Sequence, residues 1–346
     1  MRQFAITMVN PARAMDPLTH TATGLFLGRI GLNRWTPGAT AILLLAANAP
    51  DFDIVSASGG SLDYLHLHRH LTHSLLALPL MAILPVVLVR WVGRKPVRWL
   101  GGWLAAMVAV ATHLLLDFTN MYGIRLLLPF SGEWLRLDLT SVIDLWIWAV
   151  LLLSVTGPFI GRLVGSEIAS TAVRPAHYGR GFAWFALLFL LLYNCGRGVL
   201  HARAVAVLDS RLYEQTAPLR VAALPHAVNP LEWRGIVETR DFYAVQDVNL
   251  AGEFDPTRAA IFRKPEPDAA MESAARTEAF RRFLEFAQYP LWMVSPAADP
   301  ENSRTVELLD MRFGTPREPG FVAAALVDER NRVLKSSFTF GLARPR

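Results

Sequence analysis

The sequence predicts a mainly α-helical membrane bundle followed by a small α+β domain. Hydrophobic residues make up 53% of the 346 residues and charged residues only 18%, a balance that is unusual for a soluble protein. Four apolar stretches have the length of a membrane-spanning helix, whereas the chain after residue 208 is polar and contains none. We therefore expect an N-terminal extension (residues 1–14), a membrane-embedded helical region (15–208) and an extramembrane α+β domain (209–346).

The expected membrane helices follow one another closely. The four long apolar stretches are residues 74–92, 99–116, 142–160 and 182–200. Two shorter apolar segments, 18–32 and 37–49, precede them, and each would form a helix about 20 Å long. We expect this pair to form a tight helical hairpin that almost crosses the bilayer.

Basic residues are concentrated in loops that would share one side of the membrane. These loops carry Arg29 and Arg34, then Arg90, Arg94, Lys95 and Arg98, and finally Arg162, Arg174 and Arg180. The positive-inside rule makes that side cytoplasmic. The opposite side of the membrane would then receive the C-terminal domain and the loops rich in histidine and aspartate.

Charge and cysteine content exclude two classes of function. The net charge of +5 is modest, and the basic residues lie mostly between apolar runs, so they indicate orientation in a lipid bilayer and no nucleic-acid binding. The single cysteine, Cys195, excludes an intrachain disulfide and a cysteine-based zinc site. The N-terminus lacks an apolar core of signal-peptide length, and translation starts at either Met1 or Met15.

Short alternating segments predict strands in the C-terminal domain. Residues 305–313 form one such segment, and residues 321–328 and 333–340 flank a plausible hairpin turn, ERNR. Residues 270–287 have the apolar spacing of a helix.

Candidate site residues gather at the predicted non-cytoplasmic ends of the helices. His113 and Asp117 lie four residues apart, so both side chains can reach one ion from the same helix face. Ionisable groups at such a depth are costly and therefore usually functional. The alternative is a pair of solvated interface residues.

Two aspartates and a histidine come from the hairpin region. Asp51 and Asp53 follow the second short helix, and His20 lies near the start of the first. Asp51 and Asp53 point in different directions if the segment is extended. One could bind a metal and the other could orient a histidine, or the pair could simply end the helix.

Four histidines fall within eight residues of the stretch YLHLHRHLTHSLLAL at residues 64–78. We expect His73, at the start of an apolar helix, to be a metal ligand, followed by His68. His66 and His70 are more typical of supporting or exposed residues. Thr72 or Ser74 would cap the helix if the cluster has no metal.

This set of His and Asp side chains, without a thiolate, suits zinc, or manganese as the second choice. A bound ion of this kind lowers the pKa of its water and supplies a nucleophile for hydrolysis. No glycine-rich phosphate loop or G-x-S-x-G nucleophile elbow is present. Metal-activated hydrolysis is therefore the most economical chemistry for the site.

Several short motifs together resemble the YdjM/YbcI-type (DUF457-like) membrane-bound proteins. They are Thr19-His20-x-x-x-Gly24, Pro50-Asp51-x-Asp53, His68-Arg69-x-x-Thr72-His73-Ser74, His113-x-x-x-Asp117, Tyr122-Gly123 and Pro129-Phe130-Ser131. The resemblance covers residues 15–200 and implies a metal-dependent hydrolase of the bacterial inner membrane, without fixing the substrate. His70 departs from the family pattern, which has a small residue there.

A looser likeness concerns the order of Asp53, His68 and His113-x-x-x-Asp117. It is similar to the ligand order of the zinc phospholipase C and P1-nuclease group, which implies a phosphoester substrate and a cluster of up to three ions. A lipid head group is the natural form of such a substrate at membrane depth.

The complete expectation is a hydrolase with one to three divalent ions and a lipid-linked or envelope substrate. The expected metal ligands are His20, Asp53, His68, His73, His113 and Asp117. Asp51 and Asp144 are the expected catalytic groups, for proton transfer or ligand orientation. Arg69 and Arg197 are the expected substrate-binding residues, although Arg197 could instead extend to the membrane interface. A metal transporter or sensor, or an envelope scaffold, is the alternative function.

Overall fold

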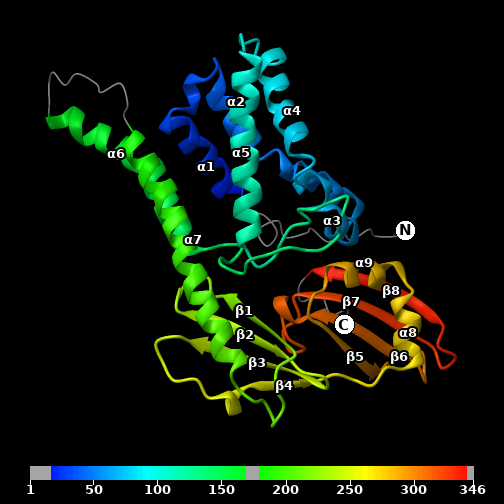
Figure 1. Cartoon of the computed structure of the whole chain (residues 1–346). Coiled ribbons are helices and arrows are strands. Elements are labelled where there is room, and N and C mark those ends of the chain that lie inside the picture. Colours follow the sequence, from blue (N-terminus) through cyan, green and yellow to red (C-terminus); the bar gives the residue numbers. More distant parts are fainter. Residues whose placement is uncertain (1–16, 169–178, 341–346) are drawn as a thin grey trace.

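The computed structural model describes residues 17–168 and 179–340, and it divides into a helical region and a region with two β-sheets (Figure 1). The helical region contains α1 (Pro17–Ile30), α2 (Ala39–Ala46), α3 (Ser61–Leu67), α4 (Leu78–Trp91), α5 (Trp99–Thr119), α6 (Leu145–Ile168) and α7 (Arg180–Asp209). Three short 3-10 helices connect them: η2 (Leu32–Arg34), η3 (Pro50–Gly59) and η4 (Leu71–His73).

Helix α1 joins two apolar cores. On one side it packs with α2, α4 and α5 through a core rich in alanine, and on the other with α6 and α7 around Phe26. Small residues let the helix axes approach, as is common inside membranes. At Gly24 a Cβ atom would lie 2.7 Å from the carbonyl oxygen of Leu43. The hairpin expected at residues 18–49 is therefore present as the tightly packed pair α1 and α2.

The prediction of four long spans is not confirmed. By length and composition, α5 and α7 can each cross a membrane, and up to four spans result if two bent helix pairs each count as one. The pairs are Ala39–Ala46 with Pro50–Gly59, bent by 47°, and Ser61–His73 with Leu78–Trp91, bent by 89°. The apolar part of α6, Leu145–Gly161, is shorter. Because residues 74–77 form a turn, the helix expected from residue 74 begins at Leu78.

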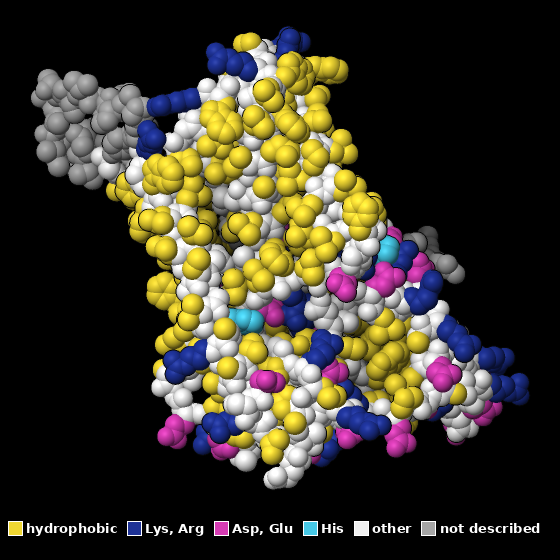
Figure 2. Space-filling view, in the orientation of Figure 1, with side chains coloured by type: hydrophobic (Ala, Val, Ile, Leu, Met, Phe, Trp, Pro, Cys, Tyr) yellow, Lys and Arg dark blue, Asp and Glu magenta, His cyan; other side chains and the backbone are white. Residues whose placement is uncertain are grey.

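Exposed hydrophobic side chains cover the helical region on the face shown in Figure 2, and charged side chains gather on the β region and at the opposite end. That far end contains the loops around Arg34 and residues 93–98, which lie together because the Arg98 N–H donates to Thr36 Oγ1 at 2.7 Å. The distribution fits a helical region surrounded by lipid.

The C-terminal region contains two antiparallel four-stranded sheets. The first has the order β1 (Arg220–Pro225), β2 (Glu232–Glu238), β3 (Phe242–Asn249) and β4 (Ala260–Arg263), with a short helix η5 (Pro256–Arg258) before β4. The second has the order β5 (Pro290–Pro296), β6 (Arg304–Asp310), β7 (Phe321–Val327) and β8 (Val333–Phe340), with η6 (Met311–Phe313) after β6. The predicted hairpin is confirmed as β7 and β8.

The helix expected over residues 270–287 is wrong as a single element. It is two helices, α8 (Ala269–Ala275) and α9 (Glu278–Phe286). Thr277 separates them, and its hydroxyl donates to the Ala274 carbonyl at 2.7 Å. Both helices pack on the second sheet, α8 through buried alanine and methionine side chains and α9 through buried phenylalanines.

Two connections fix the C-terminal region to the helical region. Helix α7, about 45 Å long at 1.5 Å per residue, ends on the first sheet, where Ala204 and Leu208 pack against Trp233. In the second connection, one hydrophobic core contains Leu65, Tyr122 and Trp134 of the helical region together with residues of α9 and the second sheet. The end of the helical bundle that carries the histidines and aspartates therefore faces the C-terminal domain.

Candidate metal centre

Five segments bring the predicted site residues to one end of the bundle. His20 comes from α1, Asp51 and Asp53 from η3, His68 from the end of α3, and His73 from η4. His113 and Asp117 lie one turn apart on α5. Pro50 begins η3 and turns the chain at the end of α2, after which Asp51 faces His113 of α5 and Asp53 faces His68.

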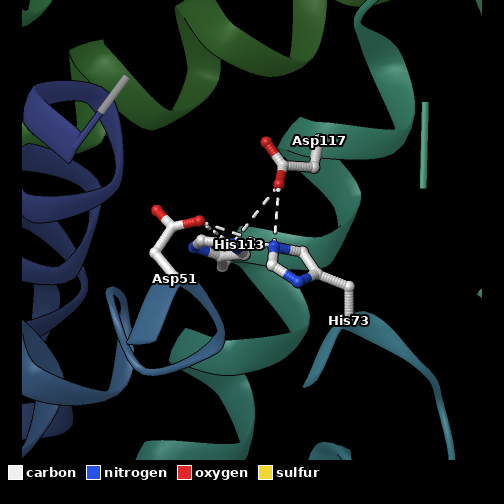
Figure 3. A group of neighbouring side chains, drawn as sticks. All are labelled: Asp51, His73, His113 and Asp117. Atoms are coloured by element: carbon white, nitrogen blue, oxygen red, sulfur yellow. Dashed lines mark hydrogen bonds and ion pairs between the residues drawn. The ribbon is translucent and has the colours of Figure 1, made fainter. Parts of the chain in front are cut away.

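Four side chains form the central group: Asp51, His73, His113 and Asp117 (Figure 3). Each offers a ligand atom within 4.8 Å of the others, and none is more than 7% exposed. Asp117 Oδ2 lies 3.3 Å from His73 Nε2 and 3.4 Å from His113 Nε2. Asp51 Oδ1 lies 3.5 and 3.7 Å from the same two nitrogens. Two imidazoles and two carboxylates at this spacing are a donor set for a divalent ion.

The two imidazoles are oriented by bonds at their other nitrogens. His113 Nδ1 lies 2.8 Å from the Ala47 carbonyl oxygen, which can only accept, so Nδ1 carries the proton. His73 Nδ1 lies 3.0 Å from Thr72 Oγ1 and 3.3 Å from Asp53 Oδ2. The Thr72 hydroxyl already donates to Asp53, so His73 Nδ1 donates as well. Both Nε2 atoms then face the centre, where they lie 3.1 Å apart, as in metal sites with histidine oriented from behind.

Asp53 organises the loop that carries the histidines. Its Oδ2 accepts from the Arg69 backbone N–H at 2.8 Å and from the Thr72 hydroxyl at 3.0 Å, and its Oδ1 lies 2.9 Å from His68 Nδ1. Sequence reasoning expected Asp53 among the ligands and Asp51 in a catalytic role. The central group contains Asp51 instead, and Asp53 lies behind it, next to His68.

His20 lies on the other side of Asp117. Its Nε2 is 3.4 Å from Asp117 Oδ1, and its ring stacks on that of His113 with centroids 3.8 Å apart. His20 therefore contacts the central group without belonging to it.

Arg69 is a buried cation beside the group. It is 2% exposed, and its Nη2 donates to Asp117 Oδ1 at 2.8 Å. Its Nη1 donates to Asn120 Oδ1 at 3.1 Å and to the Gly123 carbonyl at 3.3 Å. Both terminal nitrogens are thus used by the protein, and the guanidinium lies over the Tyr122 ring. This arrangement holds Asp117 in place and argues against the expected role of Arg69 as a free substrate clamp.

His66 and His70 lie outside the central group. His66 Nδ1 lies 3.7 Å from Glu285 of α9, and both histidines are partly exposed. They match the supporting or exposed role that the sequence suggested.

A small cavity adjoins the centre between α1, the end of α5 and the start of α6. It has a volume of about 30 Å³ and is lined by His20, Arg69, Asp117 and Asp144, together with apolar and hydroxyl side chains. This space holds about one water molecule. Asp144 accepts hydrogen bonds from the N–H groups of Trp146 and Ile147 and from the Tyr193 hydroxyl, and burial raises the pKa of its carboxyl group above the ordinary value.

Arg197 does not reach this cavity. Its guanidinium is buried, donates to the carbonyl groups of Leu139 and Pro230, and stacks on Trp233 at 4.0 Å. It connects α7 to two loops, which corrects the expectation of a phosphate clamp or an interface residue.

The C-terminal domain supports the wall of the site. Arg312 is 1% exposed, pairs with Asp310, and donates to the carbonyls of Met121 and Tyr122 in the loop after α5. The same loop contains Asn120, which holds Arg69. Sequence reasoning missed Asn120 and Arg312, because nothing in their local sequence links them to residues so far away in the chain.

The comparisons with known proteins cover both regions. Residues 269–341 match the family model described as the YfhP C-terminal alpha/beta plait domain. The protein YfhP of Bacillus subtilis (strain 168), whose name states that it is uncharacterized, is 26% identical over 339 residues, or 94% of each chain. No solved structure matches the chain. The model of the YdjM inner membrane protein family matches residues 15–204, and the chain, with the motifs of this site in that range, belongs to that family.

Proposed function

We propose that this chain is a membrane-bound, metal-dependent hydrolase whose ion is held by Asp51, His73, His113 and Asp117. The observation that carries the proposal is the pair of inward-facing Nε2 atoms, each oriented from behind, between two carboxylates in a buried space. When bound, a divalent ion would supply Lewis-acid chemistry and activate water for hydrolysis. The N and O donor set favours zinc, with manganese as the second choice.

The charges of the site support a divalent cation. The carboxylates of Asp51, Asp53 and Asp117 face one buried cation, Arg69, so with neutral histidines the formal charge is negative by two. Buried charge without a counter-charge is strongly unfavourable. One divalent ion would neutralise it.

The proposed substrate is a phosphoester or related bond of a lipid-linked or envelope molecule. The cavity beside Asp117 lies between α1, α5 and α6, next to the apolar side chains of Leu116, Val142 and Ile147. With room for about one water molecule, it suits the attacking water, while the substrate would reach the centre from the bilayer. Asp144 lines the same cavity and, with its raised pKa, would hold or transfer a proton there. By the positive-inside rule, the centre and the C-terminal domain would lie on the periplasmic side.

A non-catalytic metal-binding membrane protein is the second candidate, and one observation favours it. Asp51 and His73 lie at the breaks of the two bent helix pairs, and broken helices carry the ion sites of many transporters. The burial of all four side chains would also suit a sensor or a structural ion.

Two assays separate these candidates. The full chain, purified in detergent and loaded with zinc, is expected to hydrolyse a chromogenic phosphodiester or a phospholipid head group. His113→Gln and Asp117→Asn should abolish turnover, whereas His70→Gln, a matched histidine outside the centre, should not. Retained zinc with no hydrolysis of any ester, together with zinc uptake into proteoliposomes, would favour transport and refute the hydrolase.

A further inference from the structure

The loop between β1 and β2, residues 226–231, is bound to the start of α6 through its backbone. The Ala227 carbonyl accepts a hydrogen bond from the Leu145 backbone N–H at 3.3 Å. The Val228 carbonyl accepts one from the indole Nε1–H of Trp146 at 2.8 Å. This loop of the C-terminal domain is therefore held at the level where α6 leaves the helical region.

The backbone of this loop is bonded within the protein. The next three carbonyls along the loop also have protein donors: Asn229, Pro230 and Leu231 accept from the Glu232 N–H, the Arg197 guanidinium and the Leu250 N–H. Every carbonyl from residue 227 to residue 231 thus has a donor from the chain itself. A loop in water can leave its carbonyls to the solvent, whereas an apolar layer requires each of them to be bonded within the protein.

The side chains at this junction are apolar and exposed. Val228 and Leu231 of the loop are exposed, as are Leu145 and Trp146 of α6. Residues 226–231 include no lysine, arginine, aspartate or glutamate. A tryptophan at the end of an apolar helix is typical of the membrane interface. The loop therefore continues the apolar surface of α6 onto the C-terminal domain.

The depth of the loop matches one surface of a bilayer. Helix α7 starts at Arg180, in one of the basic loops, and its Arg197 holds the β1–β2 loop. From Arg180 to Arg197 the helix rises about 26 Å at 1.5 Å per residue. The hydrocarbon core of a bilayer is about 30 Å thick. With the basic loops at one surface, the β1–β2 loop lies close to the other.

We propose that the β1–β2 loop enters the surface of the lipid bilayer, with Val228 and Leu231 in contact with lipid, and that the C-terminal domain thereby rests on the membrane. Because Asp144 directly precedes Leu145, the loop also fixes the cavity beside Asp144 at this surface. The inference concerns contact with lipid alone and does not depend on a bound ion or on hydrolysis.

Site-directed spin labelling of the full chain in phosphatidylcholine and phosphatidylglycerol vesicles tests this proposal. Cys195→Ser removes the native thiol, and Val228→Cys provides the single site for a nitroxide. Leu212→Cys is the matched control, because both side chains are 55% exposed and α7 continues about 18 Å past Arg197 before it ends at Asp209. Leu152→Cys, on the exposed apolar face of α6, is the lipid reference.

Power saturation compares collisions of the label with oxygen, which concentrates in lipid, and with a water-soluble nickel chelate. We expect the ratio of oxygen to nickel collisions at residue 228 to be several-fold higher than at residue 212 and closer to that at residue 152. Equal ratios at residues 228 and 212 would overturn the proposal. A label at residue 228 that neither reagent reaches would replace lipid by protein as the covering partner and would also overturn it. Leu231→Cys gives the same test if Val228→Cys fails to fold.

Discussion

His73 Nε2 and His113 Nε2 lie 3.1 Å apart in a fully buried space. Both rings direct an Nδ1–H towards Asp53 and Ala47, so the close contact of the two Nε2 atoms needs either one further proton or a cation beside them. Without either, their lone pairs would repel each other. A divalent ion bound there, as proposed, would meet this need, and the sequence alone could not locate its position.

Thr72 is expected to tune metal affinity without touching the ion. Its hydroxyl donates a hydrogen bond to Asp53 and accepts one from His73 Nδ1. Loss of such a supporting hydrogen bond costs about 10–100-fold in metal affinity. Thr72→Val should weaken zinc binding by this factor in a competition assay with a chelating dye. Thr156→Val on α6, where the hydroxyl bonds only the Leu152 carbonyl, is the matched control. Equal affinities in the two variants would refute the role of Thr72.

Arg312 is expected to carry much of the stability of the interface between the two regions. Arg312→Met removes the charged partner of the buried Asp310, which keeps only backbone N–H donors. It also removes the side-chain donor to the carbonyls of Met121, Tyr122 and Phe286. Breaking a buried pair of this kind costs about 3–5 kcal/mol. Thermal unfolding in detergent should show this loss. Arg332→Met breaks an exposed pair with Asp328 and should cost less than about 1 kcal/mol; similar losses in both variants would contradict this account.

The contact between α1 and α2 is expected to depend on Gly24. A Cβ there would lie 2.7 Å from the Leu43 carbonyl and 2.9 Å from Ala47 Cβ, so Gly24→Ala forces the helices apart. Overpacking of this kind costs about 1–3 kcal/mol. Gly28→Ala, one turn later on the same helix, meets Leu43 Cδ1 at an ordinary 3.5 Å and should leave the unfolding temperature almost unchanged. A stable Gly24→Ala variant would show that the helices can separate freely.

Asp144 gives the protein a defined pH dependence. Burial raises its pKa in the folded state above the ordinary 3.8, so the folded state holds this proton more tightly than the unfolded state does. The stabilisation of the folded state by this tighter proton binding is complete below pH 3.8 and is lost as pH rises through the pKa of Asp144 in the folded state. The unfolding temperature of the wild type should therefore fall as pH rises above 3.8, and Asp144→Asn should remove the part of this fall that Asp144 causes. An unchanged pH profile in the variant would contradict a raised pKa.

Apolar length predicted α5 and α7 well, because a long uninterrupted apolar run has few alternatives to a helix. It failed at α4, where the Leu75 N–H pairs with the Leu126 carbonyl and draws the chain into a turn. The apolar spacing of residues 270–287 likewise predicted one helix where the structure has two, separated at Thr277. The local sequence pattern carries no information about these long-range and capping hydrogen bonds.

The candidate site was predicted in part. The spacing of His113 and Asp117 on one helix was sufficient to place them together. The roles of Asp51 and Asp53 depend on which way η3 turns after Pro50, and η3 packs against α3 and η4, which follow it in the chain. The contribution of Asn120 and Arg312 depends on contacts across the two regions, which the sequence does not reveal.

The most direct test of the central claim is the X-ray absorption spectrum of zinc bound to the full chain. We predict nitrogen and oxygen ligands at about 2.0–2.1 Å, with the scattering pattern of imidazole, and loss of this zinc in the His73→Gln/His113→Gln double variant. A sulfur ligand at about 2.3 Å, or zinc that the double variant retains unchanged, would contradict a metal centre built from Asp51, His73, His113 and Asp117.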